Sequence, residues 1–204
     1  LTKTTGSDKL HNPTTKDYQT MIKIINASNP NLQTLADITD KESFEDFLTS
    51  NAAKITTIFT MMKRNNGKWI LHPELKGTIT QLTTLPDLSK LSQLQQLYLQ
   101  GCSKLSSLPD LSKLTRLQQL GLGGCSRLSS LPDLSNLTQL HSLSLLGCRK
   151  VPNYQAISNN PVAKNKDQVK ALLKKLNALS TTPTIGLTKT TGSDKLHNPT
   201  TKDY

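Results

Sequence analysis

Leucine recurs through the middle of the chain with a fixed period of 23 residues. The units span residues 85–107, 108–130 and 131–153, and the first two are identical at 18 of 23 positions. In each unit, leucines spaced three apart precede a short stretch in which leucine alternates with polar residues. The spacing of three favours a loose 3₁₀-like coil, whereas the alternation is typical of a short β-strand. Each unit therefore predicts one strand, one turn and one return segment.

Stacking would bury the leucines of these units, because a single unit is too small to bury its own apolar face. Successive strands would form a parallel sheet with a spacing of about 4.8 Å. Ile79 and Leu82 stand 23 residues before Cys102 and Leu105, so a degenerate half-unit precedes the first full unit. The pattern predicts an α/β solenoid, which is a short array of stacked units that needs a cap at each end.

The recurring phrase is L-x-x-L-x-L-x-x-C-x-x-L, which the first unit supplies as Leu94, Leu97, Leu99, Cys102 and Leu105. It recurs in register in the next two units, with Val151 in place of the last leucine of the third. These units resemble leucine-rich repeats. The phrasing is most similar to units of plant disease-resistance receptors and of effector-like proteins from intracellular bacteria. The resemblance covers about residues 79–153, and it implies an exposed sheet face that binds partner proteins.

Apolar residues at helical spacing flank the units on both sides. The N-terminal side predicts three helices, built on Tyr18, Met21, Ile22 and Ile25, on Phe44, Phe47 and Leu48, and on Ile55, Ile58, Phe59 and Met62. Residues 69–71 would form a first strand that joins this helical lobe to the units. The C-terminal side predicts an amphipathic helix that covers the last unit, built on Val169, Leu172, Leu173, Leu176 and Leu179.

The two ends of the chain carry a second repeat, since residues 187–204 copy residues 1–18 without a change at an offset of 186. Three origins are open, namely a tandem array of 186-residue modules, an artificial duplication of the ends, or a self-association element used twice. An array would gain avidity, or would form a filament if each module docks on the next.

The expected domain organisation follows from these patterns. It comprises a Thr-rich linker or arm (1–18), an N-terminal helical cap (19–68), the leucine-rich repeats (69–153), a C-terminal helical cap (154–182), and a linker that ends in the copied segment (183–204).

Side chains that flank the strand leucines point to the exposed sheet face, because successive side chains along a strand alternate. The candidate partner-binding residues are Gln96, Tyr98, Gln100, Gln119, Gly121, Gly123, His141, Ser142, Ser144 and Leu146. Gly121 and Gly123 would leave a shallow depression beside Tyr98 that could seat a partner side chain. A plain solvated face is the alternative. The narrow sheet favours a peptide or a loop as the ligand.

Three cysteines recur at the unit spacing, Cys102, Cys125 and Cys148. In the repeats that these units resemble, an Asn ladder usually satisfies backbone groups at this position. We expect buried thiols that behave as small apolar side chains. No metal is expected there, because His partners and a CxxC pair are missing. The thiols mildly favour a reducing compartment, yet a secreted effector or a cell-surface array is preferred to a cytoplasmic protein.

Composition adds a net charge of +11, from 25 Lys+Arg against 14 Asp+Glu. Candidate anion-contacting residues recur along the units as Lys104, Arg127, Arg149 and Lys150. Solubility and local charge pairing explain this charge better than a nucleic-acid or membrane partner does, because no nucleic-acid motif or interleaved aromatic residue accompanies it. An acidic column that could supply such pairing is formed by Asp87, Asp110 and Asp133.

Catalytic motifs are missing, because no GxSxG, HExxH or phosphate-binding glycine loop occurs in the sequence. We therefore expect no enzyme activity and no cofactor. The sequence favours a non-enzymatic interaction module that binds a peptide or loop on its sheet face. The alternative is a structural subunit of a self-assembling filament or tandem array, associating through residues 1–18 and 187–204.

Overall fold

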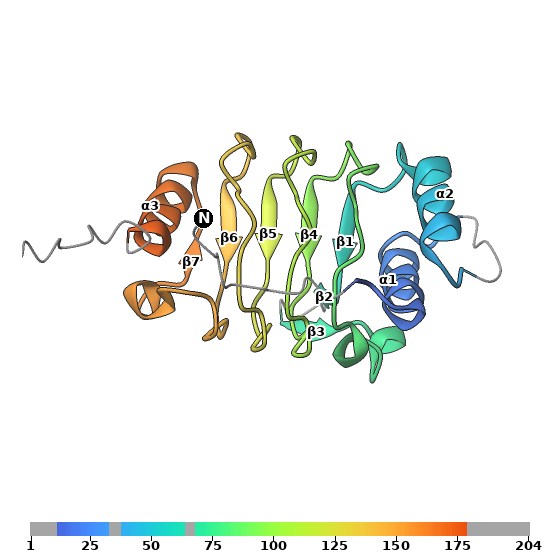
Figure 1. Cartoon of the computed structure of the whole chain (residues 1–204), viewed down its shortest axis with the longest axis horizontal. Helices are drawn as coiled ribbons and strands as arrows, with labels where there is room; N and C mark the ends of the chain where they lie inside the picture. The colour runs from blue at the N-terminus through green and yellow to red at the C-terminus, as the bar shows by residue number, and fades with distance from the viewer. Residues whose placement is uncertain (1–11, 33–37, 64–67, 179–204) are drawn as a thin grey trace, which may run out of the picture.

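The computed structural model describes residues 12–32, 38–63 and 68–178 (Figure 1). Its α/β fold has a five-stranded, mostly parallel sheet with helices at both ends, and a separate two-stranded sheet. The helices are α1 (Thr15–Ser28), α2 (Lys41–Asn51) and α3 (Lys166–Asn177), with 3₁₀ turns at Pro73–Leu75, Ile79–Gln81 and Tyr154–Ile157. The strands are β1 (Thr57–Phe59), β2 (Met61–Lys63), β3 (Trp69–Leu71), β4 (Gln96–Tyr98), β5 (Gln119–Gly121), β6 (Ser142–Ser144) and β7 (Val162–Ala163).

Each 23-residue unit contributes one strand to the large sheet, as the alternating leucines predict. The strand order is β1-β4-β5-β6-β7, and β1, β4, β5 and β6 pair in parallel. The register aligns Leu97 with Leu120 and Leu120 with Leu143. The ladder continues beyond the strands, since the Leu99 nitrogen donates to the Gly121 carbonyl at 2.7 Å. The leucines of successive units therefore stack in register and bury one another.

One continuous hydrophobic core runs from the N-terminal helices through the units to α3. The leucines spaced three apart, such as Leu88, Leu91 and Leu94, are fully buried on the return segments. Leu97 and Leu99 enter the same core from the strand side. Burial of this many leucines compensates for an aromatic content of only 4%, because apolar area removed from water drives folding whatever residue supplies it.

Two local features repeat in every unit, namely a glycine with positive φ and an aspartate that accepts a backbone hydrogen bond. Gly101, Gly124 and Gly147 adopt φ of 83°, 80° and 81°, which is the left-handed region that a residue with a Cβ avoids. The acidic column lies at the start of the return segments, where each aspartate accepts a bond from the backbone nitrogen two residues later, as in Asp110 with Ser112 at 2.8 Å. These bonds lower the pKa of Asp110 and of Asp133. The column therefore closes turns.

Helix α1 docks on the first unit through a buried carboxylate. Asp17 completes a capping box with Thr14, and its Oδ1 also accepts bonds from the backbone nitrogens of Thr83 at 2.7 Å and Thr84 at 3.1 Å. Asp17 is only 1% exposed. Burial tends to raise its pKa, but the hydrogen bonds from Thr14, Thr83 and Thr84 outweigh burial and leave the pKa lowered. The helix begins at Thr15, four residues before the expected cap boundary.

The third N-terminal helix predicted from Ile55, Ile58, Phe59 and Met62 is wrong. Ile55 precedes β1, Ile58 and Phe59 lie in β1, and Met62 lies in the hairpin of β2 with β3, because threonines between the apolar residues favour extended backbone. Ile58 pairs with Leu97 at an offset of 39 residues, which exceeds the unit period by 16. The hairpin thus lies in an insertion between β1 and the half-unit at Ile79. The strand predicted at Trp69–Leu71 exists, but it pairs in this hairpin and not in the large sheet.

Helix α1 also closes the outer edge of β1. Ser28 Oγ accepts a bond from the Phe59 nitrogen at 2.7 Å and donates to the Phe59 carbonyl at 3.1 Å, while Asn29 donates to the Thr57 carbonyl at 2.9 Å. These side chains stand where a further strand would pair, so this edge is not open to edge-to-edge association.

The opposite end of the sheet is closed by β7 and α3 (Figure 1). Strand β7 pairs with β6 in the antiparallel direction and was not foreseen. Helix α3 buries Val169, Leu172 and Leu176, which confirms the predicted amphipathic face. Leu179, predicted for the same face, lies outside the described residues, as do residues 1–11 and 187–204 of the copied segments.

Candidate binding face

The sheet presents one row of side chains that crosses all five strands. The register places Phe59, Tyr98, Gly121, Ser144 and Val162 side by side, and we call them the central row. The residues paired beside them, Leu97, Leu120 and Leu143, are buried in the core. Because side chains alternate along a strand, the central row lies on the opposite face of the sheet from the core. This face carries the residues predicted to bind a partner.

Two further rows flank the central one. The leading row consists of Thr57, Gln96, Gln119 and Ser142, which pair with one another across β1, β4, β5 and β6. The trailing row follows the second strand leucine of each unit and consists of Gln100, Gly123 and Leu146. The three rows carry no Asp, Glu, Lys or Arg in a chain of net charge +11. The face is therefore uncharged, polar and partly aromatic.

The depression predicted beside Tyr98 is not present. A Cβ placed on Gly121 would lie 2.3 Å from Cδ1 of Tyr98 and 2.3 Å from Nε2 of Gln100, so both side chains lie over this glycine. Gly121 is consequently buried, whereas a Cβ on Gly123 would meet only ordinary contacts at 3.6 Å or more. From the sequence, the missing Cβ of Gly121 was expected to leave empty space. In the structure, the side chains of Tyr98 and Gln100 occupy that space. The ring of Tyr98 thus forms the floor of the face.

The Tyr98 hydroxyl connects the three central strands. It donates a hydrogen bond to Oε1 of Gln119 on β5, and it also bonds with Ser142 on β6. Burial raises the pKa of the Tyr98 phenol, although the bond with Ser142 lowers it in part. The phenol therefore stays protonated and keeps its donor role over the working pH range. These bonds hold the ring flat across the sheet and pre-organise the face.

The trailing row contains Leu146, which is the most exposed large apolar side chain among the described residues. Leu146 is 60% exposed and is the sole large hydrophobic residue with such exposure in the described part of the chain. In the same row, Oε1 of Gln100 is buried and has no hydrogen-bond partner among the described residues. An acceptor without a partner and an apolar side chain in water are two groups that a ligand would satisfy.

Sequence reasoning missed two residues of the central row, Phe59 and Val162. The Phe59 ring lies 5.2 Å from that of Tyr98 between centroids and tilted by 38°, so the row begins with an aromatic pair. The threonine-rich setting of Phe59 was the available signal for a strand. Val162 had no comparable signal, because a two-residue strand leaves no periodicity to detect. His141, which was predicted, is half-buried just before β6, with Nδ1 3.3 Å from the Gln139 carbonyl.

The three cysteines lie in the core, as predicted. Sγ of Cys125 donates to the Leu99 carbonyl at 3.3 Å, and Sγ of Cys148 donates to the Leu122 carbonyl at 3.0 Å. Burial raises the pKa of the Cys102 thiol to about 12 and that of the Cys148 thiol to about 11. Cys125 and Cys148 therefore each tie one unit to the preceding one. Within the described ranges, no cluster of three or more His, Cys, Asp or Glu side chains could hold a metal.

The candidate anion-contacting residues Lys104, Arg127, Arg149 and Lys150 are all exposed on the turns that follow the strands. We expected these cations to form ion pairs with acidic side chains along the units. Among the described side chains, the ion pair within 4.0 Å joins Lys41 and Glu45, which both lie on α2 and not in the units. These cations lie outside the three rows. No helix of the described segments is long and apolar enough to cross a membrane.

Comparison with known proteins adds no assignment, since no family model, curated protein or solved structure matches this chain.

Proposed function

We propose that this chain is a leucine-rich-repeat module of the α/β solenoid type that binds an extended peptide or a loop of a partner protein on its sheet face. The module is non-enzymatic in this proposal and needs no cofactor. The observation that carries the proposal is the composition of the central, leading and trailing rows. They place an aromatic pair, uncharged polar side chains and the exposed Leu146 on the face of the sheet opposite the core.

The constancy of the unit frame supports this proposal. Adjacent units keep the same leucines, glycine turn, aspartate and cysteine, yet they place Tyr98, Gly121 and Ser144 in the central row. Of the five positions at which the first two units differ, two lie on the sheet face, Tyr98/Gly121 and Gln100/Gly123, and these two change the size of the side chain most. In a repeat protein the stacked frame supplies stability, so the positions free to differ are those available for recognition.

A peptide fits this face better than a broad globular surface does. Five strands at about 4.8 Å span about 19 Å between the outer strands, which is the length of five or six extended residues. Glutamine and serine side chains both donate and accept hydrogen bonds, as the backbone of an extended peptide requires. The absence of charge on the three rows favours a ligand segment that is itself uncharged where it touches the face.

Selection of peptides from a displayed library tests this proposal. Peptides that bind the whole chain should lose at least tenfold in affinity to the double variant Tyr98→Glu/Leu146→Glu, because two carboxylates would be desolvated at the contact. The matched control is Ser92→Glu/Thr138→Glu, which adds the same charge at exposed positions of the return segments. Circular dichroism establishes that both variants are folded. Selected peptides that bind both variants as tightly as the unmodified chain would refute the proposed face.

A second candidate function rests on the copied segments. Residues 187–204 repeat the sequence of residues 1–18, including the Thr14 and Asp17 of the α1 capping box as Thr200 and Asp203. This repetition favours a tandem array or a filament of 186-residue modules. Deletion of residues 187–204 should then abolish any assembly seen by light scattering and electron microscopy. Assembly that persists after the deletion would remove this alternative.

A further inference from the structure

A cavity of about 440 Å³ lies between the N-terminal helices and the return segments of the first units. Helices α1 and α2 form one wall, and the backbone around Thr84 and Ser107 forms the other. The Asp17 bonds to Thr83 and Thr84 hold the two walls in place. Cavities of roughly 300–1,000 Å³ are typical of small-molecule sites. None of the residues of the central, leading and trailing rows lines this cavity, so it is distinct from the proposed binding face.

The walls of this cavity are largely apolar. Tyr18 and Phe44 contribute two rings with centroids 5.3 Å apart, tilted by 46°. Leu85, Leu108 and Pro109 face them from the return segments. Aromatic rings and branched aliphatic side chains of this kind favour a flat or compact apolar group, because its burial removes apolar area from water on both sides.

Two hydroxyl groups in the cavity wall have no hydrogen-bond partner. Oγ1 of Thr84 and Oγ of Ser107 are buried, and neither bonds to another described group. Thr84 is 6% exposed, and its backbone pairs with that of Ser107 in an isolated bridge that sets the hydroxyls side by side. A buried polar group without a partner costs about 1–3 kcal/mol. Both oxygens are shielded from solvent, so a ligand with a hydroxyl, carbonyl or amide group supplies the missing bonds once rotation about χ1 turns the hydroxyls toward the cavity.

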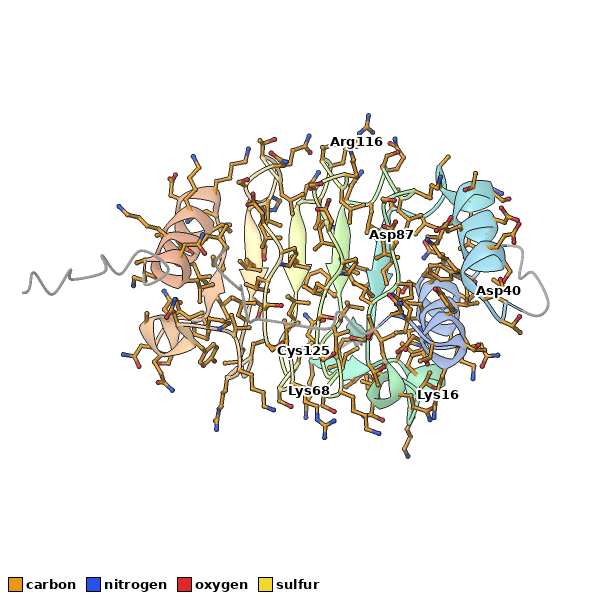
Figure 2. All side chains as sticks on the ribbon, in the orientation of Figure 1. Lys16, Asp40, Lys68, Asp87, Arg116 and Cys125 are labelled. Carbon is orange, nitrogen blue, oxygen red and sulfur yellow. The ribbon has the colours of Figure 1, made fainter. Side chains whose placement is uncertain are left out.

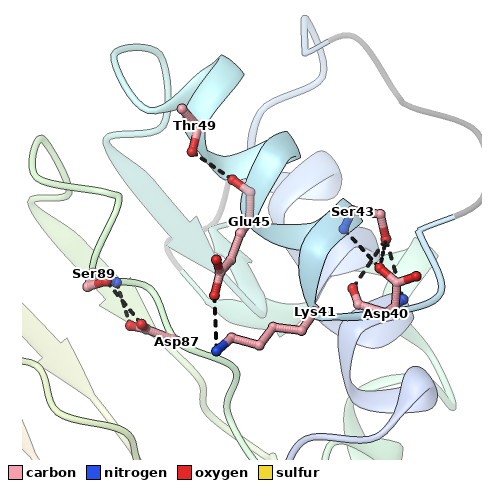
Figure 3. Close-up of polar contacts among 7 residues, drawn as sticks. All are labelled: Asp40, Lys41, Ser43, Glu45, Thr49, Asp87 and Ser89. Carbon is pink, nitrogen blue, oxygen red and sulfur yellow. Dashed lines mark hydrogen bonds and ion pairs between the residues drawn. The ribbon is translucent and has the colours of Figure 1, made fainter.

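The charged residues at this cavity are mainly acidic, although the protein is basic. Glu45 and Asp87 line it together with one cation, Lys41, which gives −1 where the whole chain has +11. Lys41 Nζ pairs with Oε1 of Glu45 at 3.5 Å, and Asp87 accepts bonds from Ser89 (Figure 3). In Figure 3 this pair on α2 stands beside the segment that carries Asp87. A cation would therefore be attracted to the mouth of the cavity and an anion repelled.

We propose that this cavity binds a small amine that carries an apolar body. The apolar body would lie between the aromatic rings and Leu108, a polar substituent would bond the Thr84 and Ser107 hydroxyls, and the ammonium would face Glu45 and Asp87. A second cavity at α3 comprises the equivalent segment of the third unit, but none of the unpartnered buried atoms among the described residues lies in it. The hydroxyl pair and the acidic mouth thus single out the N-terminal cavity.

Three indole compounds with one apolar body and different charge test this proposal by titration followed with amide NMR shifts. Tryptamine is the cation, tryptophol the neutral analogue with a hydroxyl, and indole-3-acetate the anion. Tryptamine should shift the amides of Thr84, Leu85, Ser107 and Leu108 and should bind at least threefold more tightly than tryptophol. Indole-3-acetate should bind most weakly. Absence of shifts at these amides up to millimolar tryptamine, or preference for indole-3-acetate, would overturn the proposal.

Substitutions at the cavity provide the second readout. Asp87→Asn should weaken tryptamine binding about threefold, whereas Asp110→Asn, the equivalent change one unit further, should leave it unaltered. Ser107→Ala should weaken binding, whereas Ser130→Ala should not. Equal effects of each variant and its control would show that tryptamine binding does not depend on the residues of this cavity, which contradicts a site there. A high-resolution structure that shows water on both hydroxyls and no ordered tryptamine at saturation would likewise contradict it.

Discussion

The carboxylate of Asp17 accepts a hydrogen bond from the Thr83 backbone nitrogen at 2.7 Å, across 66 residues of sequence. This contact fixes helix α1 against the half-unit that precedes the first full unit. The labelled Arg116, by contrast, points outward at the edge of the fold (Figure 2). A buried carboxylate at this junction makes the attachment of the N-terminal lobe sensitive to one residue and to pH.

Asp17→Ala should destabilise the protein by about 3 kcal/mol, because the backbone nitrogen of Thr84 would stay buried without an acceptor and that of Thr83 would lose its charged partner. Chemical denaturation measures this loss. Asp133→Asn is the control. Asp133 is exposed and closes a turn, and asparagine keeps a side-chain oxygen that can accept the same bond. The free energy of unfolding should therefore change by no more than about 0.5 kcal/mol. A loss for Asp17→Ala no larger than that of the control would show that the contact does not hold the lobe.

Acid should weaken the same junction. The folded pKa of Asp17 lies below its ordinary value of 3.8, so the charged form is stabilised in the folded state. This contribution is fully present above the ordinary pKa and is lost as the pH falls through the folded value. Denaturation between pH 6 and pH 2 should therefore show a steeper loss for the unmodified chain than for Asp17→Asn. Parallel curves for the two proteins would contradict the assignment.

Gly121 and Gly123, two residues apart on the same face, should differ in their tolerance of a methyl group. Gly121→Ala places a Cβ against the Tyr98 ring and should displace this ring and cost about 1 kcal/mol. Gly123→Ala meets only ordinary contacts and should change stability by less than about 0.5 kcal/mol. The chemical shifts of the Tyr98 ring and denaturation curves measure both effects. Identical behaviour of the two variants would show that the ring does not lie over Gly121.

Leu145 and Leu146 provide a test of which side chains face outward. Leu145 is fully buried, so Leu145→Ala should cost about 3 kcal/mol. Leu146 is 60% exposed, so Leu146→Ala should leave stability within about 0.5 kcal/mol and weaken only the binding of a peptide. Comparable destabilisation by both changes would mean that Leu146 is also buried in the core, which contradicts the assigned directions of the two side chains.

The cysteines should resist thiol reagents in the folded protein. With the pKa of Cys148 raised to about 11, only about one thiol in a thousand is ionised at pH 8. A colorimetric thiol assay should therefore find negligible reaction until denaturant is added, after which all three cysteines of the chain react. Rapid reaction of a cysteine under native conditions would place that thiol outside the core.

The repeated units were the part of the fold that the sequence made predictable. Leucines and glycines recur at a fixed spacing, so each strand, its register and its core-facing side chains follow from local pattern alone. The segment with Ile58 and Phe59 was misassigned because spacings of three and four residues fit a helix, while β-branched neighbours and pairing with β4 favour a strand. Tertiary pairing decided between the two.

The sequence was sufficient to predict which residues lie on the binding face, but not how their side chains pack against one another there. Alternation along a strand sufficed to place Gln96, Tyr98 and Ser142 on one face. That Tyr98 folds over Gly121 depends on packing between strands, and that Asp17 joins Thr83 depends on a contact between distant segments. Neither leaves a periodic signal in the sequence, and the same holds for the cavity beneath α2.

The most direct test of the central claim maps a library-selected peptide on the whole chain by amide hydrogen exchange and NMR shifts. Binding on the sheet face predicts that the largest changes fall on β4, β5 and β6, with contacts from the peptide to the Tyr98 ring and the Leu146 methyl groups. Changes confined to the return segments, the cap helices or the basic turns, with Tyr98 and Leu146 unaffected, would contradict the proposed function.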